Sequence, residues 1–236
     1  MVGFHEGTDR RDFTTGRLFS RYETGMRLGI FGGTFDPVHL GHLLLAEVCL
    51  EQCRLDQVWL VPAALPPHKQ QRTLTPGSQR VEMLQLAISG QRSLDVSTLE
   101  LDRGGISYTW ETLSALRDAH PNSDLFFLMG ADSLADLPRW REPQRICELA
   151  LPVAVRRVGS AELDFNLLDS IASPQRIAEM RQFQVEMPLI ELSSTDLRER
   201  FSTGRSVRFR TPRAVEKYVE THRLYSTSDD VARSTP

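Results

Sequence analysis

A short apolar segment, a glycine turn and a histidine-bearing helix start constrain the fold of this chain more than any other feature. Leu28 to Phe31 has the composition of a buried strand, and 43–50 has that of a helix. Between them, residues 32–42 read GGTFDPVHLGH. Free backbone N–H groups and the helix dipole favour an anion at such a junction. The segment therefore predicts an α/β fold that places a phosphate near this turn.

The turn lacks the residues of two common nucleotide-binding loops. Neither G-x-G-x-x-G nor G-K-[ST] occurs in it. Instead His39 and His42 stand three residues apart, with Gly41 between them. At a helix start this spacing places both imidazoles on one face, toward the expected anion. Without further context, the same residues also fit a tight turn and two histidines satisfied at a helix cap.

Strands and helices alternate along the rest of the chain. We expect strands at 57–61, 125–129, 149–155 and 188–192, an extended segment at 94–101, and helices at 75–89, 108–119, 195–201 and 211–219, with Pro212 at the first helical position. This alternation predicts a doubly wound, mostly parallel, Rossmann-like sheet in a single domain. Because ligands lie beyond the carboxyl ends of such strands, the loops after Phe31, Val61, Met129 and Val155 are expected to line one crevice.

The ends of the chain differ from its middle. Residues 1–25 show no apolar periodicity and are predicted to be a disordered extension, with Met26 as a candidate alternative start. The folded domain is expected at 26–225 and a loose tail at 226–236. A net charge of -3 gives no reason to expect a nucleic acid or membrane partner. No stretch has the length of an apolar membrane span, and residues 1–25, which carry charge throughout and no apolar core, are not expected to be a secretory signal.

Three cysteines, Cys49, Cys53 and Cys147, form no C-x-x-C pair. Cys49 and Cys53 share a helix face, which is typical of core packing, and further ligands at zinc spacing are missing. Free thiols suit a reducing compartment, so we expect a cytoplasmic protein. The helix patterns leave its oligomeric state open.

Several loops after the expected strands carry side chains suited to a nucleotide. Lys69 follows stiffening prolines and offers a mobile charge. Asp132 closes the 125–129 strand, where a carboxylate can accept hydrogen bonds from a ribose, although it also fits a helix N-cap. Trp140 has polar neighbours and is a candidate stacking platform. Arg156 and Arg157 end a strand, and the sequence leaves open which of them would stack on adenine or whether both are solvated.

The segment at 192–198, LSSTDLR, combines a helix cap with a second candidate anion site. Ser193 and Asp196 fit a capping box. The capping box leaves Arg198 without a role. Together with Ser194 and Thr195, this arginine would form an anion site on the first turn of the helix.

Residues 32–42 resemble the G-x-F-x-P-x-H-x-G-H signature of the nucleotidyltransferase superfamily. The chain from about Met26 to Tyr225 resembles the bacterial nicotinate-mononucleotide adenylyltransferases, whose elements occur here in the same order. They are H-x-G-H at 39–42, P-P-H-K at 66–69, R-x-G-x-S-Y-T at 103–109, G-x-D at 130–132, Trp140 and S-S-T-x-x-R at 193–198. The first 25 residues and the basic stretch 207–210 depart from the family pattern.

The resemblance implies an enzyme of NAD biosynthesis that transfers the adenylyl group of ATP to nicotinate mononucleotide and releases pyrophosphate. The acceptor phosphate would attack in line without a covalent intermediate, and Mg²⁺ would be held by substrate phosphates. The resemblance implies catalytic roles for His39, His42, Lys69 and Arg198. It implies ATP binding by Gly32, Gly33, Thr34, Phe35, Gly130, Asp132, Arg157, Ser193, Ser194 and Thr195. It implies that Tyr108, Thr109 and Trp140 bind the pyridine nucleotide.

Other readings of the same motifs stay open. Nicotinamide mononucleotide, pantetheine phosphate or a cytidylyl donor would use the same H-x-G-H chemistry, although Tyr108, Thr109 and Trp140 favour a pyridine nucleotide. Class I aminoacyl-tRNA synthetases carry a similar histidine signature, but this chain is short for one and lacks their K-M-S-K-S loop. A catalytically idle nucleotide-binding protein usually lacks a phosphate-binding residue, and here both histidines, Lys69 and Arg198 are present.

Overall fold

The computed structural model describes residues 25–67 and 73–226. Within them the strands form one parallel sheet of order β3-β2-β1-β4-β5-β6. The strands are β1 (Arg27–Gly33), β2 (Gln57–Pro62), β3 (Leu94–Val96), β4 (Asp124–Gly130), β5 (Leu151–Arg157) and β6 (Val185–Met187). The order reverses between β1 and β4, so the carboxyl end of β1 lies at the point where such folds bind ligands. The predicted doubly wound parallel sheet is confirmed.

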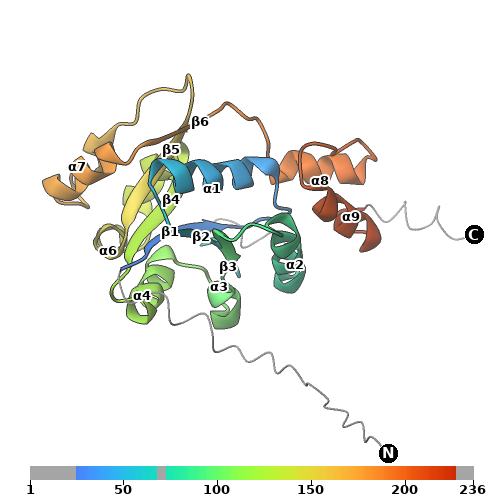
Figure 1. Ribbon diagram of the computed structural model, residues 1–236, viewed down its shortest axis with the longest axis horizontal. Helices are drawn as coiled ribbons and strands as arrows, with labels where there is room; N and C mark the ends of the chain where they lie inside the picture. The colour runs from blue at the N-terminus through green and yellow to red at the C-terminus, as the bar shows by residue number, and fades with distance from the viewer. Residues whose placement is uncertain (1–24, 68–72, 227–236) are drawn as a thin grey trace, which may run out of the picture.

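Helices cover both faces of this sheet. They are α1 (Leu40–Gln52), α2 (Gly77–Ala87), α3 (Leu99–Arg103), α4 (Thr109–Ala119), α5 (Ala131–Asp136), α6 (Pro143–Leu149), α7 (Pro174–Gln182), α8 (Ser194–Ser202) and α9 (Arg213–Thr221), with 3-10 turns η3 (Leu137–Arg139) and η4 (Phe165–Leu168). Helix α1 lies on one side of the sheet and α3 and α4 on the other, while α8 and α9 lie together at one end of the molecule (Figure 1). No helix in the described part of the chain is both long and apolar enough to cross a bilayer.

The central strands supply the core because they are apolar on both faces. Every residue from Leu125 to Met129 is buried, as are Leu28, Ile30 and Phe31 on the neighbouring strand. Runs of this kind are typical of parallel strands that helices cover on both sides.

The cysteines fill the core as expected. Cys49, Cys53 and Cys147 are buried and free. Burial raises the pKa of Cys53 and of Cys147 to about 11, so both thiols stay protonated and pack as small apolar groups.

Three predicted segments are wrong in detail. The extended segment expected at 94–101 stops at Val96, and α3 begins at Leu99, where the Thr98 hydroxyl donates to the Asp102 carboxylate at 2.7 Å. The strand expected at 188–192 lies earlier, at Val185–Met187, because Pro188 has no N–H to donate to a ladder. The strand expected at 149–155 begins at Leu151, since α6 runs to Leu149.

Candidate active site

Two cavities adjoin the carboxyl ends of the strands, where the sequence predicts one crevice. The apolar cavity has a volume of about 470 Å³ and is lined in part by Gly32, Val61, Pro67, Tyr108, Phe127 and Trp140. The histidine cavity has a volume of about 460 Å³ and is lined in part by Asp36, His39, His42, Asp132, Arg157 and Arg198. Thr34 lines both, so the turn after β1 separates two adjacent chambers. The loop after Val61 borders the first cavity, those after Met129 and Val155 border the second, and the loop after Phe31 borders both.

The two histidines cap the helix on which they stand. The backbone N–H of His39 donates to Nδ1 of His42 at 3.2 Å, and the N–H of His42 donates to Nδ1 of His39 at 3.3 Å. The rings stack with centroids 3.6 Å apart. Glycine at position 41 leaves room for this, because a Cβ there would lie 3.1 Å from Nδ1 of His39. The helix cap that the sequence left open as an alternative is therefore present, and both histidines also line the histidine cavity.

This reciprocal cap assigns the tautomer of both rings. A nitrogen that accepts a hydrogen bond carries no proton, so each neutral imidazole holds its proton on Nε2. Burial lowers the pKa of His39 from 6.5 to about 4, which keeps that ring neutral at pH 7. His39 is thus an uncharged Nε2–H donor, and the cap holds His42 in the matching tautomer.

The start of α1 offers fewer free amides than the sequence predicts. The N–H groups of His39 and His42 serve the cap, and the N–H of Leu40 donates to the carbonyl of Arg210 at 2.9 Å. An anion at this point would therefore find more of its hydrogen-bond donors on the imidazoles than on the backbone. The contact also gives the stretch 207–210 a structural role, which its basic side chains did not reveal.

Side chains from distant elements hold the carbonyls of the turn between β1 and α1. The carbonyls of Thr34, Asp36, Pro37 and Val38 accept hydrogen bonds from Arg80, Arg198, Ser194 and Thr211, respectively. Three of these bonds measure 2.8–2.9 Å. The donors come from α2, α8 and the segment before α9, so the turn is fixed by segments that follow it at 42 or more positions along the chain, three of the four donors lying in the last 43 residues.

The start of α8 borders the histidine cavity as predicted. The Ser193 hydroxyl accepts from the N–H of Asp196 at 3.1 Å, which is half of the expected capping box. The carboxylate of Asp196 pairs instead with Arg200 at 2.8 Å. Nη2 of Arg198 donates to the Thr195 hydroxyl at 2.9 Å. Ser193, Ser194, Thr195 and Arg198 all line the cavity, so the structure brings them together with the histidines.

Gly130, Asp132 and Arg157 lie in the wall of the same cavity. Gly130 is the N-cap of α5, and the exposed Asp132 is a residue of its first turn, so the N-cap alternative for Asp132 is not realised. Arg156 pairs with Glu186 on the neighbouring strand. Since side chains alternate along a strand, Arg157 takes the position that borders the cavity.

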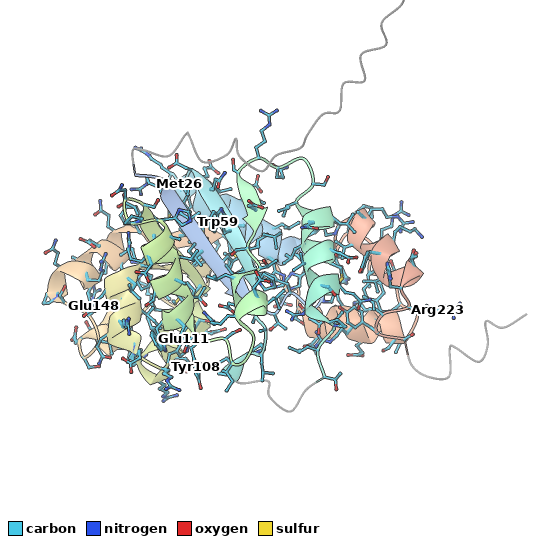
Figure 2. All side chains as sticks on the ribbon, turned by 90° about the horizontal axis from the view of Figure 1, so that it is seen from below. Met26, Trp59, Tyr108, Glu111, Glu148 and Arg223 are labelled. Carbon is cyan, nitrogen blue, oxygen red and sulfur yellow. The ribbon has the colours of Figure 1, made fainter. Side chains whose placement is uncertain are left out.

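The residues predicted to hold a pyridine nucleotide lie around the apolar cavity. Tyr108, Thr109 and Trp140 line it, and the Trp140 ring meets Phe127 edge-on with centroids 6.0 Å apart. Tyr108 lies at the end of α4 remote from Met26, which precedes β1 (Figure 2). The Ser107 hydroxyl accepts from the N–H of Ala64 at 2.9 Å, which joins two of the lining loops.

Three of the residues predicted to bind ATP do not line the histidine cavity. Gly32 and Gly33 line the apolar cavity. Phe35 lines neither cavity, because its ring is 1% exposed and lies edge-on beneath His42 with centroids 5.0 Å apart. Its place in the structure is that of a support for the imidazole. Lys69 lies outside the described residues.

Sequence reasoning missed other charged groups in the cavity walls. Arg141 lies over the Tyr108 ring, with its guanidinium carbon 4.7 Å from the centroid, and lines the apolar cavity. Glu100 is 6% exposed, borders the same cavity and accepts from the Thr112 hydroxyl at 2.6 Å. Its position next to Trp140 could have indicated that Arg141 lies at the site. No sequence signal indicated Glu100, because its segment was expected to be extended.

In the two ranges that the structure covers, no group of three or more His, Cys, Asp or Glu side chains could hold a metal ion. A divalent ion at this site would need ligands from a bound substrate.

Comparison with known proteins gives a consistent result. Residues 30–200 match the cytidylyltransferase-like family. A probable nicotinate-nucleotide adenylyltransferase of Thermomicrobium roseum is 45% identical over 201 residues, which is 85% of this chain and 92% of the relative. A protein of the same name from Thermus thermophilus is 44% identical over 200 residues, which is 85% of this chain and 100% of the relative.

Solved structures with a similar fold include Plasmodium falciparum nicotinic acid mononucleotide adenylyltransferase, complexed with APC in one case and with NaAD in another. Each has a TM-score of 0.64 and 18% sequence identity, and each comparison covers 85% of this chain and 97% of that chain. At this identity the likeness concerns the fold.

Proposed function

The chain belongs to the nicotinate-nucleotide adenylyltransferases of the cytidylyltransferase-like family, and we propose that its two cavities hold the two substrates of that reaction. The enzyme transfers the adenylyl group of ATP to nicotinate mononucleotide in NAD biosynthesis. ATP would occupy the histidine cavity and the pyridine nucleotide the apolar cavity. The observation that carries this assignment is the shared wall at Thr34, where the α-phosphorus and the acceptor phosphate would meet.

The acceptor phosphate is ionised at neutral pH, so the reaction needs no general base. Catalysis then depends on alignment of the two phosphates and on donors aimed at the charge that develops on them. We assign this task to the Nε2–H groups of His39 and His42. As neutral, preorganised donors they would stabilise the transition state without the desolvation cost of a buried cation.

The outer phosphates would lie at the start of α8. Ser194, Thr195 and Arg198 line the same cavity as the histidines, and Ser193 caps the helix whose N–H groups open toward it. By resemblance, Lys69 would add a further cation. Pyrophosphate would leave from this end of the cavity as the new bond forms at the other.

The nucleoside parts would be held farther from the reaction centre. Asp132 would accept hydrogen bonds from the adenosine ribose, and Arg157 would stack on adenine. In the apolar cavity, Trp140 would stack on the nicotinate ring, and Tyr108 and Thr109 would contact the mononucleotide. All five side chains border the cavity to which they are assigned.

We further propose that Mg²⁺ accompanies ATP and is held by phosphate oxygens and water, since the described residues present no carboxylate cluster. When bound, the ion would neutralise part of the phosphate charge. We also propose that the folded domain spans residues 26–225, with extensions at 1–25 and 226–236. A cytoplasmic location is proposed as well, and the three free thiols support it.

The decisive assay follows pyrophosphate release from ATP and Mg²⁺, with nicotinate mononucleotide and nicotinamide mononucleotide as parallel acceptors. Strong preference for the acid is expected. Equal rates would make the enzyme dual-specific, and no release with either acceptor would contradict the proposed function.

A further inference from the structure

One buried carboxylate, that of Asp36, lies inside the turn that carries the histidines. It is 2% exposed. The Tyr225 hydroxyl donates to its Oδ1 at 2.6 Å, and the N–H of Thr75 approaches its Oδ2 at 3.4 Å. Burying a carboxylate costs folding free energy unless hydrogen bonds replace those it made to water, so these two partners fix the orientation of the Asp36 carboxylate.

Tyr225 reaches this carboxylate from the end of the described chain, after α9. Its φ of 63° lies in the left-handed region, which a bulky residue adopts only when its surroundings hold it there. The ring packs on Phe201 of α8, with centroids 5.9 Å apart. Burial and the neighbouring Asp36 raise the pKa of Tyr225, so the hydroxyl keeps the proton it donates. Helix α9, which ends shortly before Tyr225, lies near α2 and α8 (Figure 1).

The backbone of the same turn contacts the proposed triphosphate site. The carbonyl of Asp36 accepts from Nη1 of Arg198, and the next carbonyl, of Pro37, accepts from the Ser194 hydroxyl at 2.9 Å. Asp36 therefore has Tyr225 on its side chain and Arg198 on its carbonyl. The hydrogen bonds on its carboxylate anchor Asp36 within the turn, so a shift of its backbone after their loss would move the carbonyl that orients the guanidinium.

We propose that Tyr225 is a positioning residue for adenylyl transfer, which acts through Asp36 on the orientation of Arg198 and Ser194. The inference rests on the proposed triphosphate roles of those two residues. Tyr225 touches no substrate in this arrangement. Its contribution is to keep the turn in the one conformation that presents the histidines and the α8 donors together.

The chain offers a matched control for Tyr225→Phe. The Tyr218 hydroxyl, on α9, donates to the carboxylate of Glu82 on α2 at 2.7 Å, at an exposed site away from both cavities. Each substitution removes one hydroxyl from one carboxylate. We expect Tyr225→Phe to lower kcat about tenfold, the scale of one hydrogen bond to a charged group. The KM for nicotinate mononucleotide should change less than about twofold, and Tyr218→Phe should leave both constants unchanged.

Thermal unfolding of both variants separates positioning from stability. If Tyr225→Phe lowers Tm but keeps kcat and both KM values per folded molecule, its role is only structural and the inference is overturned. A loss of kcat larger than in Tyr218→Phe, at a similar shift in Tm, supports it.

A double-mutant cycle tests the route through Arg198. Because Arg198 is one of the groups that Tyr225 is proposed to orient, adding Tyr225→Phe to Arg198→Ala should reduce kcat by clearly less than the tenfold expected in the wild-type background. A full second tenfold loss would overturn the route. If Arg198→Ala alone kept kcat and the KM for ATP, the proposed triphosphate site itself would be wrong. If instead Arg198→Ala is impaired and Tyr225→Phe keeps wild-type kcat, only the role of Tyr225 is overturned.

Discussion

Replacing His42 with asparagine or with glutamine separates the two tasks that the structure gives its ring. The asparagine oxygen can take the place of Nδ1 and accept from the N–H of His39, while the far donor is lost. The glutamine amide can reach the place of Nε2, while the cap is lost. Both variants lose the packing of the ring on His39 and Phe35, so a comparison between them isolates the two nitrogens.

The expected magnitudes follow from these contacts. Loss of one preorganised donor costs about 10²–10³ in kcat, or roughly 3–4 kcal/mol of transition-state stabilisation. Loss of an N-cap acceptor costs about 1 kcal/mol of unfolding free energy, or about 2–4 °C in Tm for a domain of this size. His42→Asn should therefore be the slower variant and the more stable one. His42→Gln should be faster and less stable, and His42→Ala should show both losses.

Steady-state pyrophosphate release and urea unfolding of the three variants supply the measurements. Wild-type turnover in His42→Asn would show that no Nε2–H donor is needed. The reverse order of the two variants in rate and stability would show that the proton sits on Nδ1, which is incompatible with the reciprocal cap.

The remaining predictions concern His39 and the apolar cavity. Burial lowers the pKa of His39 from 6.5 to about 4, so between these pH values the unfolded chain binds more protons than the folded one. The free energy of unfolding should therefore fall as the pH drops from 6.5 to 4, by at most about 1.4 kcal/mol per pH unit. His39→Asn, which caps without titrating, should flatten that slope in urea unfolding, and an unchanged slope would rule out His39 as its source. Trp140→Ala should raise the KM for nicotinate mononucleotide about tenfold through lost stacking and leave the KM for ATP nearly unchanged; equal losses in both would mark Trp140 as a core residue. Arg141→Ala should raise the KM for nicotinate mononucleotide more than the KM for nicotinamide mononucleotide, because a cation beside Tyr108 favours binding of the acid. Arg145→Ala, which removes a guanidinium stacked on Trp110 instead, is the control, and equal loss for both acceptors would deny Arg141 a part in acid selection.

Local patterns were sufficient for the central strands. The apolar runs at Leu28–Phe31 and Leu125–Met129 are typical of buried parallel strands, and the structure has β1 and β4 there. The segment 94–101 was harder to interpret, because three residues of strand and five of helix share it and neither shows a full period.

The residues of the candidate site were predictable, but the hydrogen bonds between them were not. Motif spacing brought His39, His42, Asp132, Arg157 and the start of α8 to one edge of the sheet, and the structure places them around one cavity. No local pattern shows that the two imidazoles accept from each other's backbone, or that the carbonyl of residue 210 takes the first amide of α1. The first pair is local but uses side chains that are unusual in a capping box, and the bond to residue 210 joins segments brought together only by the complete fold.

The held carbonyls of the turn also impose an order of assembly. The turn at 34–38 is among the first parts of the folded domain to leave the ribosome, but Arg198, Thr211 and Tyr225, which fix it, leave last. Since chains emerge from their N-terminus, a nascent chain can form β1 long before it can hold a nucleotide. Under the proposed assignment, the ATP site is therefore complete only late in synthesis, and a chain that ends before residue 198 would lack these three side chains that fix the turn.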